Sequence, residues 1–133
     1  MDINEAFLKD KKILIIEDDV FLGDMLLSRL KKNGAAVTLL TSAENEIDYI
    51  KEHIPDVVVL DIYLPGVNGL DFLEMLRKDA ITKDISVVVL SNTSKVEDRD
   101  RAKNLGAEFL IKAGVTPDEI VEHLGKLFRD KVK

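Results

Sequence analysis

Short apolar runs alternate with segments of helical period along the chain. Residues 12–16, 56–60 and 85–90 are nearly continuous apolar runs rich in Ile, Val and Leu. Such runs are typical of strands that are covered on both faces of a parallel sheet. Residues 36–40 and 108–111 are weaker examples of the same pattern. Five strands that alternate with helices predict an α/β fold, a parallel sheet with helices on both faces in three layers.

The helical segments carry recognisable start and stop signals. Asp19 is suited to cap the first of these helices, which we expect to end near Asn33-Gly34. The last helix has the clearest start, because Thr116 and Glu119 form a capping box around a proline at the first helical position.

The fourth helix of this series is different in composition. Ser94 and Glu97 suggest a capping box, and Val96, Ala102 and Leu105 are the residues that we expect to face inward. The rest of the segment is charged. A helix with so little apolar surface packs weakly, so we expect it to be a mobile element.

Composition narrows the range of functions. The chain has 133 residues, no cysteine and a formal net charge of −6. We expect one domain over residues 1–133, with residues 1–10 as an N-terminal extension and no output domain. An acidic surface argues against direct binding of nucleic acid. No apolar run reaches membrane-spanning length and no secretory leader is visible, so we expect a cytoplasmic location without membrane attachment.

Acidic residues follow the first expected strand. Asp19 is explained by its role as a helix cap, but Glu17 and Asp18 precede it directly. Carboxylates that lie close together repel one another unless a cation or a proton intervenes. Oxygen ligands favour a hard cation such as Mg²⁺. A plain helix start and a metal site therefore both remain open at this point.

Polar residues also end the later strands. Asp61 ends the third apolar run and precedes a Pro65-Gly66 turn signal. Ligands of such sheets bind beyond the carboxyl ends of the strands, so Asp61 would face the acids after the first strand. Ser91 and Lys112 end the fourth and fifth strands. Taken alone, Ser91 would be a local cap and Lys112 a solvated lysine. An ammonium group beside acids, however, can neutralise their charge or hold a phosphate.

Four motifs together resemble the receiver domain of two-component response regulators. They occupy residues 13–19, 57–69, 88–91 and 106–112, in the order and spacing of that family. The resemblance runs from about residue 11 to the final helix. It implies a flavodoxin-like doubly wound five-stranded sheet with strand order 2-1-3-4-5.

The resemblance also implies roles for individual residues. Asp61 would accept a phosphoryl group, and Ser91 and Lys112 would bind that group. Ser91 and Phe109 would form the conformational switch. The Mg²⁺ ligands would be Glu17, Asp18, Asp61 and the backbone carbonyl of Tyr63.

The implied partners are a sensor histidine kinase or a histidine phosphotransfer protein, and a downstream protein target. The resemblance implies a monomer or a phosphorylation-dependent dimer. The chain would not be an enzyme in the usual sense, because it would catalyse only its own phosphorylation and slow autodephosphorylation.

Two positions depart from the family pattern. Asn92 stands where a small residue is usual, and Ala113 stands where a proline is usual. We expect a trans peptide bond before Ala113, because a cis bond before a residue other than proline is costly. Phosphorylation should survive both changes with altered rates. His53 and His123 lie away from the strand ends, and we expect them to be surface residues.

Three other functions remain to be weighed. A phosphate-independent pseudo-receiver would bind proteins with the same fold, but the five polar site residues are intact. A phosphatase of the haloacid dehalogenase type needs Asp-x-Asp after its first strand, which is missing. A flavin-binding electron carrier needs a Ser/Thr/Gly-rich phosphate loop there, and the acids after residue 16 do not provide one.

Overall fold

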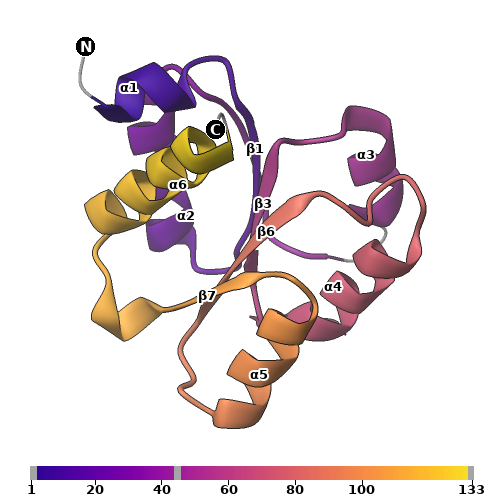
Figure 1. Ribbon diagram of the computed structural model, residues 1–133. Helices are drawn as coiled ribbons and strands as arrows, with labels where there is room; N and C mark the ends of the chain where they lie inside the picture. The colour runs from indigo at the N-terminus through magenta and orange to yellow at the C-terminus, as the bar shows by residue number, and fades with distance from the viewer. Residues whose placement is uncertain (1–2, 44–45, 132–133) are drawn as a thin grey trace.

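A parallel sheet forms the centre of the molecule (Figure 1). The computed structural model describes residues 3–43 and 46–131, and in them five strands pair in parallel in the order β2-β1-β3-β6-β7. Counted along the chain, this order is the expected 2-1-3-4-5, so the α/β flavodoxin-like prediction is confirmed. The strands are β1 (Lys12–Ile16), β2 (Ala36–Leu40), β3 (Val57–Asp61), β6 (Ser86–Ser91) and β7 (Glu108–Ile111).

Helices cover both faces of the sheet. Two groups are visible in Figure 1, with α1, α2 and α6 on one side and α3, α4 and α5 on the other. No helix within the described ranges is both long and apolar enough to cross a membrane. The helices are α1 (Ile3–Leu8), α2 (Val20–Lys32), α3 (Glu46–His53), α4 (Gly69–Lys78), α5 (Val96–Asn104) and α6 (Pro117–Lys131), with a 3₁₀ turn η1 (Lys112–Gly114) before α6.

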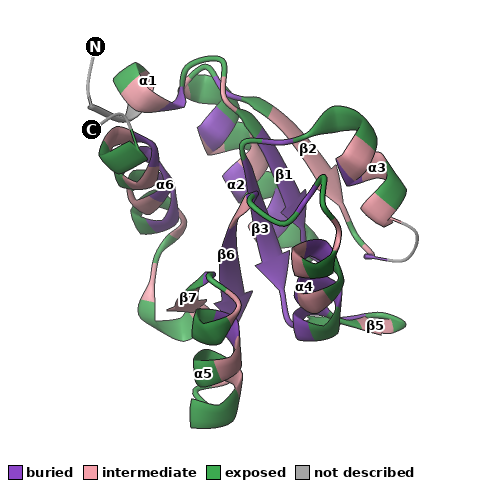
Figure 2. Cartoon of the chain, turned by 45° about the vertical axis from the view of Figure 1, so that its right-hand side comes forward, coloured by how far each residue is buried: buried purple, intermediate pink, exposed green. Residues whose placement is uncertain are grey.

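The core consists of two apolar clusters, one on each face of the sheet. Side chains alternate along a strand, so Ile13 and Ile15 pack towards α2 and α6, whereas Leu14 and Ile16 pack towards α3 and α4. All residues of β3 are buried, as expected for the central strand (Figure 2). This double coverage explains why the strands are continuous apolar runs.

The predicted caps are mostly confirmed. The Asp19 carboxylate accepts a hydrogen bond from the Leu22 amide at 3.2 Å. At the start of α6, the Glu119 amide donates to Thr116 Oγ1 at 3.1 Å and the Thr116 amide donates to Glu119 Oε1 at 3.2 Å. These are the two reciprocal bonds of a capping box. The final helix therefore begins where the sequence predicted.

The predicted start of α5 is wrong. The helix begins at Val96 after Lys95, which provides no side-chain cap, and the Lys95 amide donates instead to Thr93 Oγ1 at 3.1 Å. The turn made by Thr93 shifts the helix beyond the reach of a cap from Ser94. Val96 is 53% exposed, not inward, because the first helical turn projects past the core. Ala102 is the one buried residue of α5.

The N-terminal extension contains a helix that the sequence did not predict. Leu8 of α1 is fully buried and, with the half-buried Phe7, packs into the cluster below α2 and α6. The Lys11 ammonium lies 5.4 Å from the centre of the Phe128 ring. Six residues are too few to show a helical period, and the packing against α6 stabilises the helix.

A short hairpin connects β3 to α4. Tyr63–Leu64 (β4) pairs antiparallel with Val67–Asn68 (β5). The predicted Pro65-Gly66 turn lies between them, with Gly66 at a φ of 77°. Gly69 then passes so close to β3 that a Cβ would lie 2.1 Å from the Asp61 carbonyl oxygen. The end of β3 is thus held by backbone that leaves no room for a side chain.

Gly69→Ala should destabilise the protein by about 3 kcal/mol, because the backbone around Asp61 must move to admit the methyl group. Gly114→Ala is the matched control, since a Cβ there meets no atom within 4 Å. Its effect should be within about 0.5 kcal/mol. Urea unfolding of the three proteins gives both values. Equal midpoints for Gly69→Ala and the wild type would contradict the close approach.

Candidate functional site

Three carboxylates converge where β1 and β3 end. Ile16 of β1 is in register with Leu60 of β3, so the residues that follow them lie side by side. One carboxylate oxygen from each of Glu17, Asp18 and Asp61 lies within 4.8 Å of the others. Glu17 and Asp61 are buried, whereas Asp18 is exposed. The expected juxtaposition of these acids is confirmed.

Lys112 provides a positive charge within this acidic group. Its Nζ forms ion pairs with Glu17 Oε1 and, at 3.1 Å, with Asp61 Oδ2. The side chain is only 11% exposed. Lys112 follows β7 at the start of η1, and β6 lies between β7 and β3. A long side chain is therefore required to cross the end of β6 to the acids.

Burial dominates the electrostatics of Glu17. Its side chain is 1% exposed, and neither oxygen accepts a hydrogen bond of normal geometry from the described residues. Burial first, and then the neighbouring Asp61, raise the pKa of Glu17 to about 8, although Lys112 partly offsets them. Burial alone would lower the pKa of Lys112, but its contacts with Glu17 and Asp61 hold it above its ordinary value.

The acidic group fits a hard divalent cation. Its donors are carboxylate oxygens alone, which is the ligand set that Mg²⁺ favours. Apart from the ion pair with Lys112, no described residue donates a hydrogen bond to the buried oxygens of Glu17, whereas buried carboxylates usually accept several. A cation beside Glu17, Asp18 and Asp61 would supply the missing charge compensation. Among the three acids that follow β1, Asp19 is the one whose side chain caps α2.

Tyr63 lies beside the site and makes two polar contacts. Its amide donates to Asp61 Oδ1 at 3.4 Å, and its hydroxyl donates to Asp98 Oδ2 at 3.1 Å. The second contact links the β4–β5 hairpin to α5. It had no signal in the sequence, because the two residues are 35 positions apart. The role of the Tyr63 carbonyl as a metal ligand stays a prediction.

Ser91 and Phe109 occupy neighbouring strands beyond the acids. Ser91 is fully buried at the end of β6, and its Oγ accepts a hydrogen bond from the Thr93 amide at 3.0 Å. The hydroxyl is thus engaged with the β6–α5 loop. Phe109 in β7 is half-buried and packs against the cluster below α4 and α5. The ring lies at the boundary between the core and the surface, and its switch role stays a prediction.

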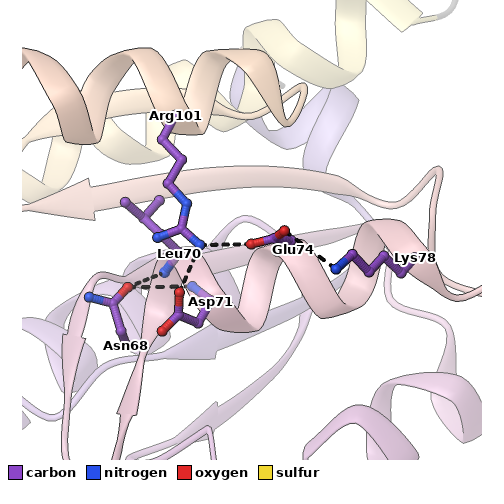
Figure 3. Close-up of polar contacts among 6 residues, drawn as sticks. All are labelled: Asn68, Leu70, Asp71, Glu74, Lys78 and Arg101. Atoms are coloured by element: carbon purple, nitrogen blue, oxygen red, sulfur yellow. Dashed lines mark hydrogen bonds and ion pairs between the residues drawn. The ribbon is translucent and has the colours of Figure 1, made fainter.

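Polar contacts hold α5 against α4. Figure 3 shows that the Arg101 guanidinium donates to Asp71 at 2.7 Å and to Glu74 at 2.8 Å. Lys78 forms a further ion pair with Glu74 at 3.4 Å. The contacts of Arg101 had no signal in the sequence, because no local pattern joins residues about thirty positions apart. Ala102 is the one buried residue of α5, and these polar contacts to α4 add to the contacts that the helix makes with β7.

The departures from the family pattern lie at the rim of the site. Asn92 is exposed after β6, and Ala113 is exposed in η1. The bond before Ala113 is trans, as expected, since the described chain contains no cis peptide bond. His53 is exposed on α3. His123 on α6 is half-buried and pairs with Glu108. Neither histidine lies among the acids at the strand ends.

The raised pKa of Glu17 predicts a pH dependence of stability in metal-free protein. Between pH about 4.5 and about 8 the folded state keeps a proton on Glu17 that the unfolded state releases. The free energy of unfolding should therefore fall as pH rises through this window. Glu17→Gln cannot ionise and should show a weaker fall.

Urea unfolding in a chelator, at several pH values, measures this difference, with Glu97→Gln on the exposed surface of α5 as the control. Added Mg²⁺ should stabilise the wild type at high pH more than it stabilises Glu17→Gln. Parallel pH profiles for the wild type and Glu17→Gln would contradict the burial of an ionisable carboxyl.

Comparison with known proteins identifies the family. The response regulator receiver domain profile matches residues 13–125. The phosphate regulon transcriptional regulatory protein PhoB of Klebsiella pneumoniae is 32% identical over 119 residues, which cover 90% of this chain and 52% of PhoB. The chain thus spans about half the length of this relative.

Solved structures agree with this match. The non-phosphorylated HemR receiver domain of Leptospira biflexa is 31% identical with a TM-score of 0.81, over 90% of this chain and 94% of that one. The BeF3-activated receiver domain of Klebsiella pneumoniae RstA is 25% identical with a TM-score of 0.76, over 88% and 97%. The profile, the sheet order and these likenesses lead to one conclusion: the chain belongs to the receiver domain family of two-component response regulators.

Proposed function

We propose that this receiver domain accepts a phosphoryl group on Asp61 in a Mg²⁺-dependent reaction. The convergence of Glu17, Asp18 and Asp61 around the Lys112 ammonium carries the proposal. The donor would be a phosphohistidine of a sensor kinase or a phosphotransfer protein. The likeness to a BeF3-activated receiver supports a site that takes a phosphoryl-like group.

The proposed reaction needs little from the protein beyond position and charge. A carboxylate oxygen of Asp61 attacks phosphorus, the phosphorus–nitrogen bond breaks, and the imidazole leaves as the neutral base after taking up a proton. Bound Mg²⁺ would supply positive charge for the phosphoryl oxygens. Lys112 already contacts Asp61 at 3.1 Å, so its ammonium lies where the negative charge increases. Hydrolysis of the resulting acyl phosphate would return the carboxylate.

The domain would turn over no other substrate. The proposed step needs no nucleophile besides Asp61 and no separate binding cleft. Its product is the acyl phosphate of Asp61, which stays attached to the domain until it is hydrolysed. We therefore class the protein as a signalling domain and not as an enzyme. Its upstream partner would be a histidine kinase or a phosphotransfer protein. Its downstream target would be another protein.

The switch is proposed to act through Ser91, Phe109 and α5. Ser91 Oγ now accepts a bond from the Thr93 amide, and the Ser91 O–H would donate to a phosphoryl oxygen on Asp61 if the side chain turned towards it. If Ser91 turns towards the phosphoryl group, the loop that begins α5 loses this contact. Phe109 could then move inward. Since α5 has one buried residue, Ala102, such a shift costs little apolar contact.

Incubation with acetyl phosphate and Mg²⁺ tests phosphorylation directly. Intact mass should show one added phosphoryl group on the wild type, no adduct on Asp61→Asn, and none after chelation of Mg²⁺. Lys112→Met should lower the rate by at least about tenfold, because the step loses its resident positive charge. No wild-type adduct, with hydrolysis shown to be too slow to hide one, would favour the phosphate-independent pseudo-receiver.

The contacts of Arg101 predict a second kinetic effect. Arg101→Ala removes two contacts that hold α5 in its present position, so the population of rearranged molecules should rise. Phosphorylation by acetyl phosphate should become about threefold faster. The matched control is Arg99→Ala, which changes an exposed residue of the same helix. Equal rates for the two variants and the wild type would show that Arg101 does not restrain the switch.

A further inference from the structure

A second cavity lies at the opposite end of the sheet from the acidic site. Its volume is about 630 Å³, and it is bordered by the first residues of β1 and β2 and by the end of α3. The acids follow the last residue of β1, whereas Lys12 at this cavity is its first. The volume falls within the range of small-molecule sites, roughly 300–1,000 Å³. The cavity shares none of its lining residues with the acidic group.

The floor of the cavity is one face of the two strands. Lys12 pairs in register with Ala36, and Leu14 pairs with Thr38. Alternate residues of a strand point to the same side, so these four side chains share the face that α3 covers. Ala36 is small and exposed. The sheet therefore has a hollow where a longer side chain would fill the space.

The hollow stays open because α3 ends early. The helix has eight residues and stops at His53. The next residue, Ile54, has a φ of 43°, a left-handed conformation that β-branched residues rarely adopt. The next residue, Pro55, is buried and lines the cavity. Strained backbone of this kind persists where the surroundings fix it, often beside a binding site.

One wall of the cavity is a fixed aromatic pair. The rings of Tyr49 and His53 stack with centroids 4.0 Å apart and planes 21° from parallel. The Tyr49 hydroxyl lies 3.3 Å from Thr38 Oγ1. His53 Nδ1 donates to the Tyr49 carbonyl at 2.9 Å, since a carbonyl only accepts. These two bonds orient the rings, so a ligand that packs against them would cost little further side-chain entropy.

The charged residues at the cavity favour an anion. Lys12 and Lys31 line it, together with a single acid, Glu52, in a chain whose net charge is −6. The Lys12 ammonium has only a long contact, 3.5 Å, to the His53 carbonyl. Lys12 thus lies beside the aromatic wall, and Lys31 borders the same cavity from the end of α2, which packs on the other face of the sheet.

We propose that this cavity is a second ligand site, which binds a small molecule composed of a planar aromatic ring and one anionic group. The ring would lie over Ala36 against the Tyr49–His53 pair, and the carboxylate or phosphate would meet Lys12 and Lys31. The site goes beyond phosphorylation and does not depend on it, because its lining residues lie at the other end of the strands.

Titration of the isotope-labelled protein without Mg²⁺, followed by backbone amide NMR, tests the proposal. The probes are naphthoate and naphthyl phosphate, with naphthamide and naphthol as neutral counterparts. We expect the anionic probes to shift amides of residues 12–14, 36–38 and 49–55. The two anions distinguish a preference for carboxylate from one for phosphate. The neutral probes should bind at least about tenfold more weakly.

Three variants locate the binding groups. Ala36→Leu should fill the hollow and abolish the shifts, while the amide spectrum of the variant remains that of a folded protein. Lys31→Met should weaken the anionic probes about tenfold, and Lys32→Met, one position along on the exposed surface, should not. No shifts at millimolar probe, shifts confined to the Asp61 end, equal binding of the neutral probes, or no effect of Ala36→Leu or Lys31→Met would each overturn the proposal.

Discussion

Glu17 is a carboxylate removed from water and placed against two other carboxylates, with one ammonium to offset them. The parallel pairing of β1 and β3 creates this constraint, because it brings their carboxyl ends together. Lys112 partly neutralises the carboxylates, because its side chain extends from the end of the edge strand β7 past β6 to reach them. The remaining imbalance explains both the raised pKa of Glu17 and the suitability of the site for a divalent cation. The proton on Glu17 and the proposed cation and phosphoryl chemistry thus have the same electrostatic cause.

The carboxyl ends of the strands connect this charge to the surface of α5. Asp61 ends β3, Ser91 ends the adjacent β6, and the chain after Ser91 leads directly into α5. On this face α4 presents several buried apolar residues, whereas α3 has one, Ile50. Helix α5 contributes Ala102 to the core and relies on Arg101 and Asp98 for polar attachments. A small change at Asp61 therefore meets an element held by weak, replaceable contacts.

The two ends of the strands have different chemistry. At the carboxyl end, acids gather around Lys112 and suit a cation and a phosphoryl group. At the amino end, Lys12 and Lys31 border an aromatic hollow that suits an anion. Because β1 runs between them, a ligand in the hollow would contact the same strand that ends beside Glu17. The short α3 and the small Ala36 leave this second end open.

The sequence by itself determined the strands and the acids that follow them, because apolar runs, caps and strand-end residues are local signals. The order of the strands in the sheet came from the resemblance to receiver domains. The capping box of Thr116 and Glu119 is an example, because these residues alone predicted where α6 begins. Only the tertiary structure decided the rest. The six residues of α1 form a helix because α6 covers Leu8, Val96 faces solvent because α5 starts late, and Arg101 finds Glu74 through packing of helices about thirty residues apart. Such features depend on distances across the fold, which no local pattern of residues records.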